Sequence, residues 1–137
     1  MPDAKRVSAN FGVALDGRVH QYVKLDDRAW ANGILEHGNR WFGPSGVNPN
    51  DLTVSIETED LHNPATAVSD AQYEAVGGLC RLILERFGSI TSITSHHVIS
   101  PLSRPDCCGA RWTQPHDGHA LSRIAALAMA AKLELRI

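Results

Sequence analysis

The stretch SDAQYEAVGGLCRLILERFG (residues 69–88) contains the clearest element of secondary structure in the sequence. Ser69 stands three residues before Gln72, the capping-box pattern of a helix N-terminus. Apolar residues recur at helical spacing up to Gly88 and define one face of the expected helix: Tyr73, Val76, Cys80, Ile83 and Leu84, with Phe87 one turn further on. A helix with one apolar face packs on another layer, and Cys80 is expected to be a small buried hydrophobe there.

Short apolar runs on both sides of this helix supply the other layer. The runs predicted to be strands are residues 7–15, 18–24, 52–60 and 90–94. The first two flank Asp16-Gly17, the strongest short hairpin signal, and the third places Leu52, Val54 and Ile56 on one face. Residues 119–133 predict a second helix. The fold class is therefore α/β or α+β, with a central sheet and helices packed on it.

The segments between these elements are expected to be loops. Residues 25–33 read as a short helical turn or loop that carries Trp30, and residues 37–51 contain turn residues throughout and no periodicity. A long exposed loop is predicted over residues 37–51.

Length and composition restrict the function. A chain of 137 residues, 43% of them apolar and 20% charged, forms one globular domain over residues 1–137. The net charge of −2 gives no reason to propose a nucleic-acid partner, and the sequence contains no membrane span. The N-terminus carries no signal peptide, so synthesis in the cytoplasm is expected. Three cysteines, two of them adjacent, favour a reducing compartment.

The loop after residue 94 gathers residues that bind metals. His96 is followed ten residues later by Asp106, then by Cys107 and Cys108. Zinc accepts imidazole, thiolate and carboxylate ligands. A surface histidine followed by a loop held in shape by tight turns would give the same sequence pattern without a metal. Glu57, on the polar side of its predicted strand, is either a general base or a solvated strand residue.

Six segments, in this order between residues 7 and 112, carry a resemblance to a known family. They are VSANFGVALDGRVHQYV, DDRAWANG, NPNDLTVSIETE, SDAQYEAV, ITSHHVISP and DCCGARW. Together they resemble the zinc-dependent N-acetylmuramoyl-L-alanine amidases, a family that includes many bacteriophage endolysins and shares its fold with the peptidoglycan-recognition proteins. The resemblance implies a central mixed β-sheet flanked by helices, with Zn²⁺ in a groove on one face. It also implies that peptidoglycan is the substrate, cut between N-acetylmuramic acid and L-alanine by a zinc-activated water.

The resemblance also assigns roles to individual residues. His96 takes the place of the second histidine ligand, Glu57 that of the general base, and Arg104 that of a basic residue that stabilises the oxyanion. The third ligand is Cys107, or Asp106 when residues are counted from His96 without a gap. The side chains implied to line the substrate groove are Trp30, Asn32 and Trp41. Trp30 would equally suit the core.

The sequence departs from the family at the first histidine ligand. Relatives carry this ligand on an opening strand, followed by a helix, before the segment that matches VSANF. The sequence shows neither that strand nor that helix upstream of VSANF. His20 and His97 are the available substitutes, and a homodimer or a complementing N-terminal segment would be another source. Alternatively, the chain is an incomplete or non-catalytic module that binds cell wall. The family function is preferred: hydrolysis of the wall after release from the cytoplasm.

Overall fold

The computed structural model describes residues 8–61, 63, 66–107, 112, 123–124 and 134–136. Its first feature is the predicted hairpin, in which β1 (Phe11–Val13) pairs antiparallel with β2 (Val19–Gln21). Gly17 adopts a φ of 84° in the connecting turn, a conformation that glycine allows at no steric cost. The Asp-Gly dipeptide therefore sets this turn, as the sequence predicts.

The hairpin belongs to a mixed sheet. Strand β3 (Ile56–Thr58) lies parallel to β1, so the strand order is β2-β1-β3. A second, parallel sheet joins β4 (Ser92–Thr94) to β5 (Glu134–Arg136). The mixed sheet implied by the resemblance is confirmed. The strands are shorter than predicted, because hydrogen-bonded pairing covers only three residues of each apolar run.

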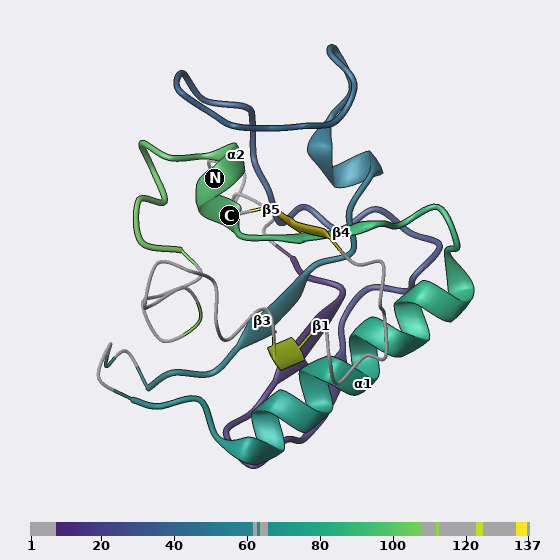
Figure 1. The fold of residues 1–137 in the computed structure, drawn as a ribbon, viewed down its shortest axis with the longest axis vertical. Coiled ribbons are helices and arrows are strands. Elements are labelled where there is room, and N and C mark those ends of the chain that lie inside the picture. Colours follow the sequence, from purple (N-terminus) through teal and green to yellow (C-terminus); the bar gives the residue numbers. More distant parts are fainter. Residues whose placement is uncertain are drawn as a thin grey trace, which may run out of the picture.

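Helix α1 (Asp70–Arg86) runs along one face of the β1–β3 sheet and supplies much of the core (Figure 1). The predicted capping box is present: the Ser69 hydroxyl accepts the Gln72 N–H at 3.0 Å, and the Gln72 side chain accepts the Ser69 N–H at 3.4 Å. The buried core cluster consists of Phe11, Val13, Tyr73, Val76, Leu79, Cys80, Ile83, Trp112 and Ile124. Cys80 is a buried core residue, as predicted, and burial raises its pKa to about 11.

Two short helices depart from the predicted pattern. The end of the loop predicted over residues 37–51 forms the 3-10 helix η1 (Pro49–Asp51), and Leu52 follows it with 46% of its surface exposed instead of joining a strand face. Asn48 caps η1 and Pro49 supplies a preset φ at its first position. Likewise, the loop predicted after residue 94 begins with the four-residue helix α2 (His96–Ile99), which follows β4 directly.

The predicted helix over residues 119–133 falls mostly outside the described residues. Within it, residues 123 and 124 are helical, and Ile124 is buried with 1% of its surface exposed. None of the helices formed by the described residues is long and apolar enough to cross a bilayer.

The capping box gives a first test. Ser69 caps α1 and its hydroxyl also donates to the Leu15 carbonyl at 2.6 Å, which ties the helix N-terminus to the end of the hairpin. We expect Ser69→Ala to lower the free energy of unfolding by about 1–2 kcal/mol in urea denaturation. Ser45→Ala, in an exposed turn, is the control and should change it by less than about 0.5 kcal/mol. Equal effects of the two substitutions would contradict the capping role.

Candidate active site

Residues from three distant segments line one large cavity beside the sheet. Its volume is about 950 Å³, and His96, Cys107 and Glu57 all contribute to its wall. His96 begins α2, Cys107 lies in the loop after it, and Glu57 comes from β3. The apolar face of α1 forms another part of the wall. The fold therefore brings three of the predicted site residues to the same cavity.

The imidazole of His96 is held in a defined orientation. Its Nε2 lies 3.1 Å from the Asn32 carbonyl oxygen. Because a carbonyl only accepts hydrogen bonds, this contact places the ring proton on Nε2 and leaves the Nδ1 lone pair free. Burial lowers the pKa of His96, which favours the neutral ring. A neutral histidine oriented by a backbone carbonyl is the usual arrangement of a metal ligand.

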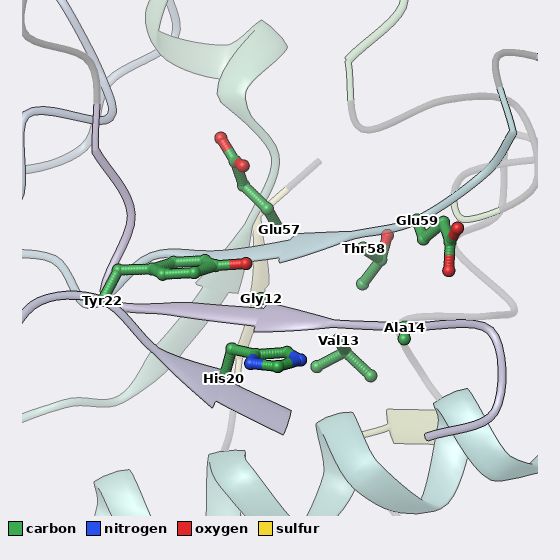
Figure 2. Close-up of a pocket in the computed structure, with 8 residues that line it drawn as sticks. All are labelled: Gly12, Val13, Ala14, His20, Tyr22, Glu57, Thr58 and Glu59. Carbon is green, nitrogen blue, oxygen red and sulfur yellow. The ribbon is translucent and has the colours of Figure 1, made fainter. Parts of the chain in front are cut away.

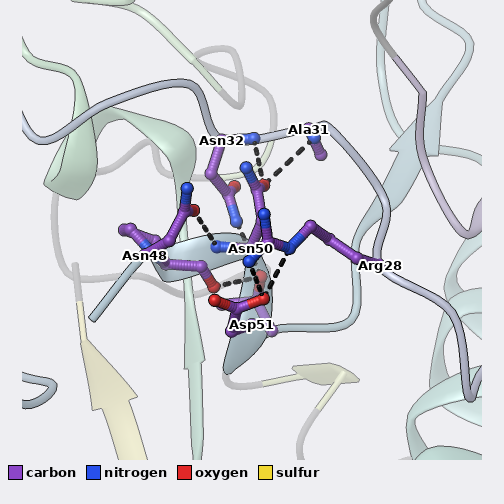
Figure 3. A network of polar contacts seen from close by, with 8 residues as sticks. Arg28, Ala31, Asn32, Asn48, Asn50 and Asp51 are labelled. Carbon is purple, nitrogen blue, oxygen red and sulfur yellow. Dashed lines mark hydrogen bonds and ion pairs between the residues drawn. The ribbon is translucent and has the colours of Figure 1, made fainter.

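The Asn32 carbonyl is itself fixed by a polar network around η1 (Figure 3). The Asn50 side-chain oxygen accepts the backbone N–H groups of Ala31 at 3.2 Å and Asn32 at 2.9 Å. The Asn32 side chain donates to the Thr53 hydroxyl at 2.6 Å. Asn32, expected in the substrate groove, does line the cavity, and it also supports His96.

Sequence reasoning missed the role of Asn50. The residue is buried, with 5% of its surface exposed, and its side chain holds a backbone segment that lies far from it in the sequence. The available signal was the run Asn48-Pro49, which is typical of a capped helix start and could have predicted a built turn in place of an exposed loop.

Cys107 and Asp106 differ in their surroundings. Cys107 is half-buried and lines the cavity, and its backbone carbonyl accepts the His97 N–H at 3.2 Å. Burial raises the pKa of the Cys107 thiol, against the lowering effect of the nearby Arg104 charge. Asp106 is exposed and is not part of the cavity wall. The structure thus brings Cys107, rather than Asp106, to the cavity that His96 and Glu57 share.

Glu57 lies on the exposed side of β3, as its position in the alternating run predicts. It forms part of the wall of the large cavity and also of a smaller neighbouring one. His20 lines the smaller cavity with Glu57 and does not join His96. His97 lines neither, and its Nδ1 is buried without a hydrogen-bond partner.

The remaining predicted residues divide into two groups. Trp41 lines the large cavity, and its indole N–H is buried without a partner in the protein. Trp30 and Arg104 line neither cavity. Trp30 lies beneath the Arg28 guanidinium and keeps 50% of its surface exposed. Trp30 is therefore not a core residue, the alternative that the sequence left open. The Arg104 guanidinium donates to the Ser103 carbonyl at 2.9 Å.

Within the part of the chain that the structure describes, no group of three His, Cys, Asp or Glu side chains is close enough to hold a metal ion. His96 and Cys107 are therefore two donors of a ligand set that the described residues do not complete.

Comparison with known proteins decides the family. The family model described as N-acetylmuramoyl-L-alanine amidase matches residues 2–116. The chain belongs to the N-acetylmuramoyl-L-alanine amidase family. It is 31% identical over 102 residues to the 1,6-anhydro-N-acetylmuramyl-L-alanine amidase AmpD of Escherichia coli, and 33% identical over 103 residues to that of Haemophilus influenzae.

The match to these amidases is partial in length. The aligned residues make up 74% of this chain but 51% of the E. coli protein and 52% of the H. influenzae protein, so the chain spans about half the length of these relatives. A crystal structure of a selenomethionine AmpD derivative superposes with a TM-score of 0.64 at 30% identity, covering 89% of this chain and 60% of that one. The amidase fold implied by the resemblance is confirmed. These relatives are bacterial amidases, and their names give no support to a phage origin.

The polar network in this amidase-family chain gives the second test. We expect Asn50→Ala to lower the free energy of unfolding by roughly 2–3 kcal/mol, because one buried and one partly buried N–H group lose their acceptor. Asn48→Ala, which removes only a helix cap, should cost about 1 kcal/mol or less. Urea denaturation of both variants measures the difference. A smaller cost for Asn50→Ala than for Asn48→Ala would contradict the role given to this network.

Proposed function

We propose that the chain hydrolyses the amide bond between the lactyl group of N-acetylmuramic acid and L-alanine of the peptidoglycan stem peptide. The observation that carries this proposal is the shared cavity of Glu57, His96 and Cys107, which combines a carboxylate with an oriented imidazole and a thiol. The names of the relatives describe amidases acting at a muramyl-L-alanine bond, which supports the same reaction class here.

Zinc is the cofactor of this proposal. His96 offers the lone pair of Nδ1, and Cys107 offers sulfur, two donor types that zinc prefers. At least one further ligand must come from outside the described residues or from another chain, because the described residues gather no third donor. Asp106 remains the alternative to Cys107, since its exposed side chain would have to turn towards His96. A zinc ion bound there would supply Lewis-acid chemistry, polarising the amide carbonyl and acidifying water.

The protein residues have distinct roles in this reaction. Glu57 takes the proton from the attacking water and returns it to the leaving nitrogen of L-alanine, as a general base and then a general acid. Trp41, with its unpartnered indole N–H in the cavity wall, binds substrate, and Asn32 keeps His96 in place. Arg104 reaches the oxyanion only after its side chain leaves the Ser103 carbonyl, and Trp30 contacts substrate from the rim.

The form of the substrate separates two versions of the proposal. An endolysin-like enzyme, from a phage or released from its cell, would cut intact cell wall, whereas the relatives are named for a 1,6-anhydro sugar. Incubation of the zinc-loaded chain with purified sacculi, and separately with soluble 1,6-anhydromuropeptides, distinguishes them. Release of stem peptide from sacculi supports the endolysin version; turnover of the soluble substrate alone supports a role on wall fragments.

A second candidate is a non-catalytic module that binds cell wall. The incomplete ligand set among the described residues favours it. This candidate predicts that the chain binds sacculi but releases no peptide even with zinc added. A homodimer or a complementing segment that supplies a histidine would restore the hydrolase, so mixing the chain with such a segment tests the two candidates further.

The ligand assignment is tested by metal content. We expect Cys107→Ser to lower the zinc bound per chain sharply, measured by mass spectrometry of the metal after dialysis, because serine is a poor ligand for zinc. Cys80→Ala is the control and should leave zinc unchanged, since burial raises the pKa of that thiol to about 11 and keeps it protonated. Unchanged zinc in Cys107→Ser, with loss in Asp106→Ala, would assign the ligand to Asp106 instead.

The role of Glu57 is tested by activity. Glu57→Gln keeps the shape of the side chain but removes the base, so we expect the rate of amide hydrolysis to fall roughly 10²–10⁴-fold with zinc content unchanged. Glu85→Gln, on the exposed face of α1, is the matched control and should keep the full rate. A rate above about a tenth of the original in Glu57→Gln would rule out general-base catalysis by this residue.

A further inference from the structure

A second, smaller cavity lies beside Glu57 on the exposed face of the three-stranded sheet (Figure 2). Its volume is about 340 Å³, at the lower end of the range for small-molecule sites. Residues of all three strands line the cavity, His20 of β2 among them, together with Tyr22 and Glu59, which directly follow β2 and β3. His20, Tyr22 and Glu59 have no role in the reaction described above.

The register of the sheet explains how these side chains meet. Gly12 on the central strand is the partner of His20 on β2 and of Glu57 on β3. Directly paired residues on neighbouring strands point to the same face of a sheet, and so do residues two apart along a strand. Hence His20 and Tyr22 stand on one side of Gly12, with Glu57 and Glu59 on the other.

Tyr22 occupies the space that a side chain at position 12 would fill. A Cβ atom at Gly12 would lie 2.6 Å from the Tyr22 hydroxyl oxygen and 2.7 Å from Cε2, so a side chain at this position would have to push the ring aside. Tyr22 nevertheless keeps 63% of its surface exposed. The His20 ring lies parallel to it within 6°, with 6.3 Å between the ring centres. The sheet thus presents two parallel rings to solvent beside an exposed carboxylate.

We propose that this cavity is a subsite for a sugar ring, with Tyr22 as its stacking platform. The C–H face of a pyranose packs on an exposed aromatic ring, and its hydroxyl groups donate to carboxylates such as Glu57 and Glu59. A protein partner would need a far larger surface than this cavity offers.

The position of the subsite fits the glycan part of peptidoglycan, and in this respect the inference rests on the proposed function. Glu57 forms a wall common to both cavities. A substrate whose scissile amide lies by Glu57 and His96 can extend its sugar over Gly12 to Tyr22, while its stem peptide stays on the side of the large cavity. Tyr22 is therefore a binding residue that selects for the sugar.

Isothermal titration with two separate probes, N-acetylmuramic acid and the dipeptide L-Ala-D-Glu, tests this subsite in the zinc-loaded chain. Tyr22→Ala removes the ring; Gly12→Ala keeps it but displaces it, because the new Cβ would collide with the phenol. Both should weaken binding of the sugar about tenfold and leave binding of the dipeptide unchanged. Tyr22→Phe retains the ring and should stay within about threefold of the original affinity. Circular dichroism confirms that each variant is folded.

Three results would overturn the proposal: no binding of the sugar to the original chain, an affinity for the sugar in Tyr22→Ala and Gly12→Ala that is unchanged from the original chain, or a loss confined to the dipeptide. The last would assign the cavity to the peptide. If the sugar binds in a Tyr22-dependent manner but no amide is hydrolysed, the subsite stands and the proposed hydrolase fails, so the two failures are distinguishable.

Discussion

The hydrogen bond between His96 and the Asn32 carbonyl is the contact on which the site depends. It joins the start of α2 to a loop more than sixty residues earlier in the chain, and it sets the ring proton on Nε2. The Ser100 hydroxyl donates to the same carbonyl at 3.3 Å, so both ends of α2 are tied to one atom. Asn50, by holding the Asn32 N–H, fixes the position of that carbonyl. The imidazole is thereby positioned by backbone atoms rather than by neighbouring charges.

The sheet contributes the other half of the site. Because β3 is parallel to β1 and paired along its length, Glu57 projects from a rigid strand beside Gly12. The buried face of the same strands rests on α1, whose start is fixed by Ser69 and Gln72. The carboxylate and the imidazole therefore come from separate elements that meet at one cavity.

Much of this could be predicted from the sequence because its signals are local. The Asp16-Gly17 turn, the capping box at Ser69 and the apolar face of α1 each depend on a few neighbouring residues, and all are present. Glu57, His96 and Cys107 could be named from the order of the motifs. Their shared cavity could not, because it results from the packing of distant segments.

The features that escaped prediction depend on contacts remote in sequence. Asn50 reads as a turn residue, and only its contact with residues 31 and 32 reveals that it supports His96. The position of the Tyr22 ring over Gly12 could be predicted only if the register of the hairpin were known to within one residue. Whether Cys107 or Asp106 is the candidate ligand likewise depends on which side chain the loop turns towards the cavity. The order of residues in the sequence does not determine that orientation.

Mass spectrometry of the products from a zinc-loaded sample of the chain and a defined muropeptide tests the central claim most directly. If Glu57, His96 and Cys107 form an amidase centre, the products are the muramic acid sugar and a stem peptide that begins with a free L-alanine amine. An intact muropeptide in the presence of bound zinc, or cleavage at any other bond, would contradict that claim.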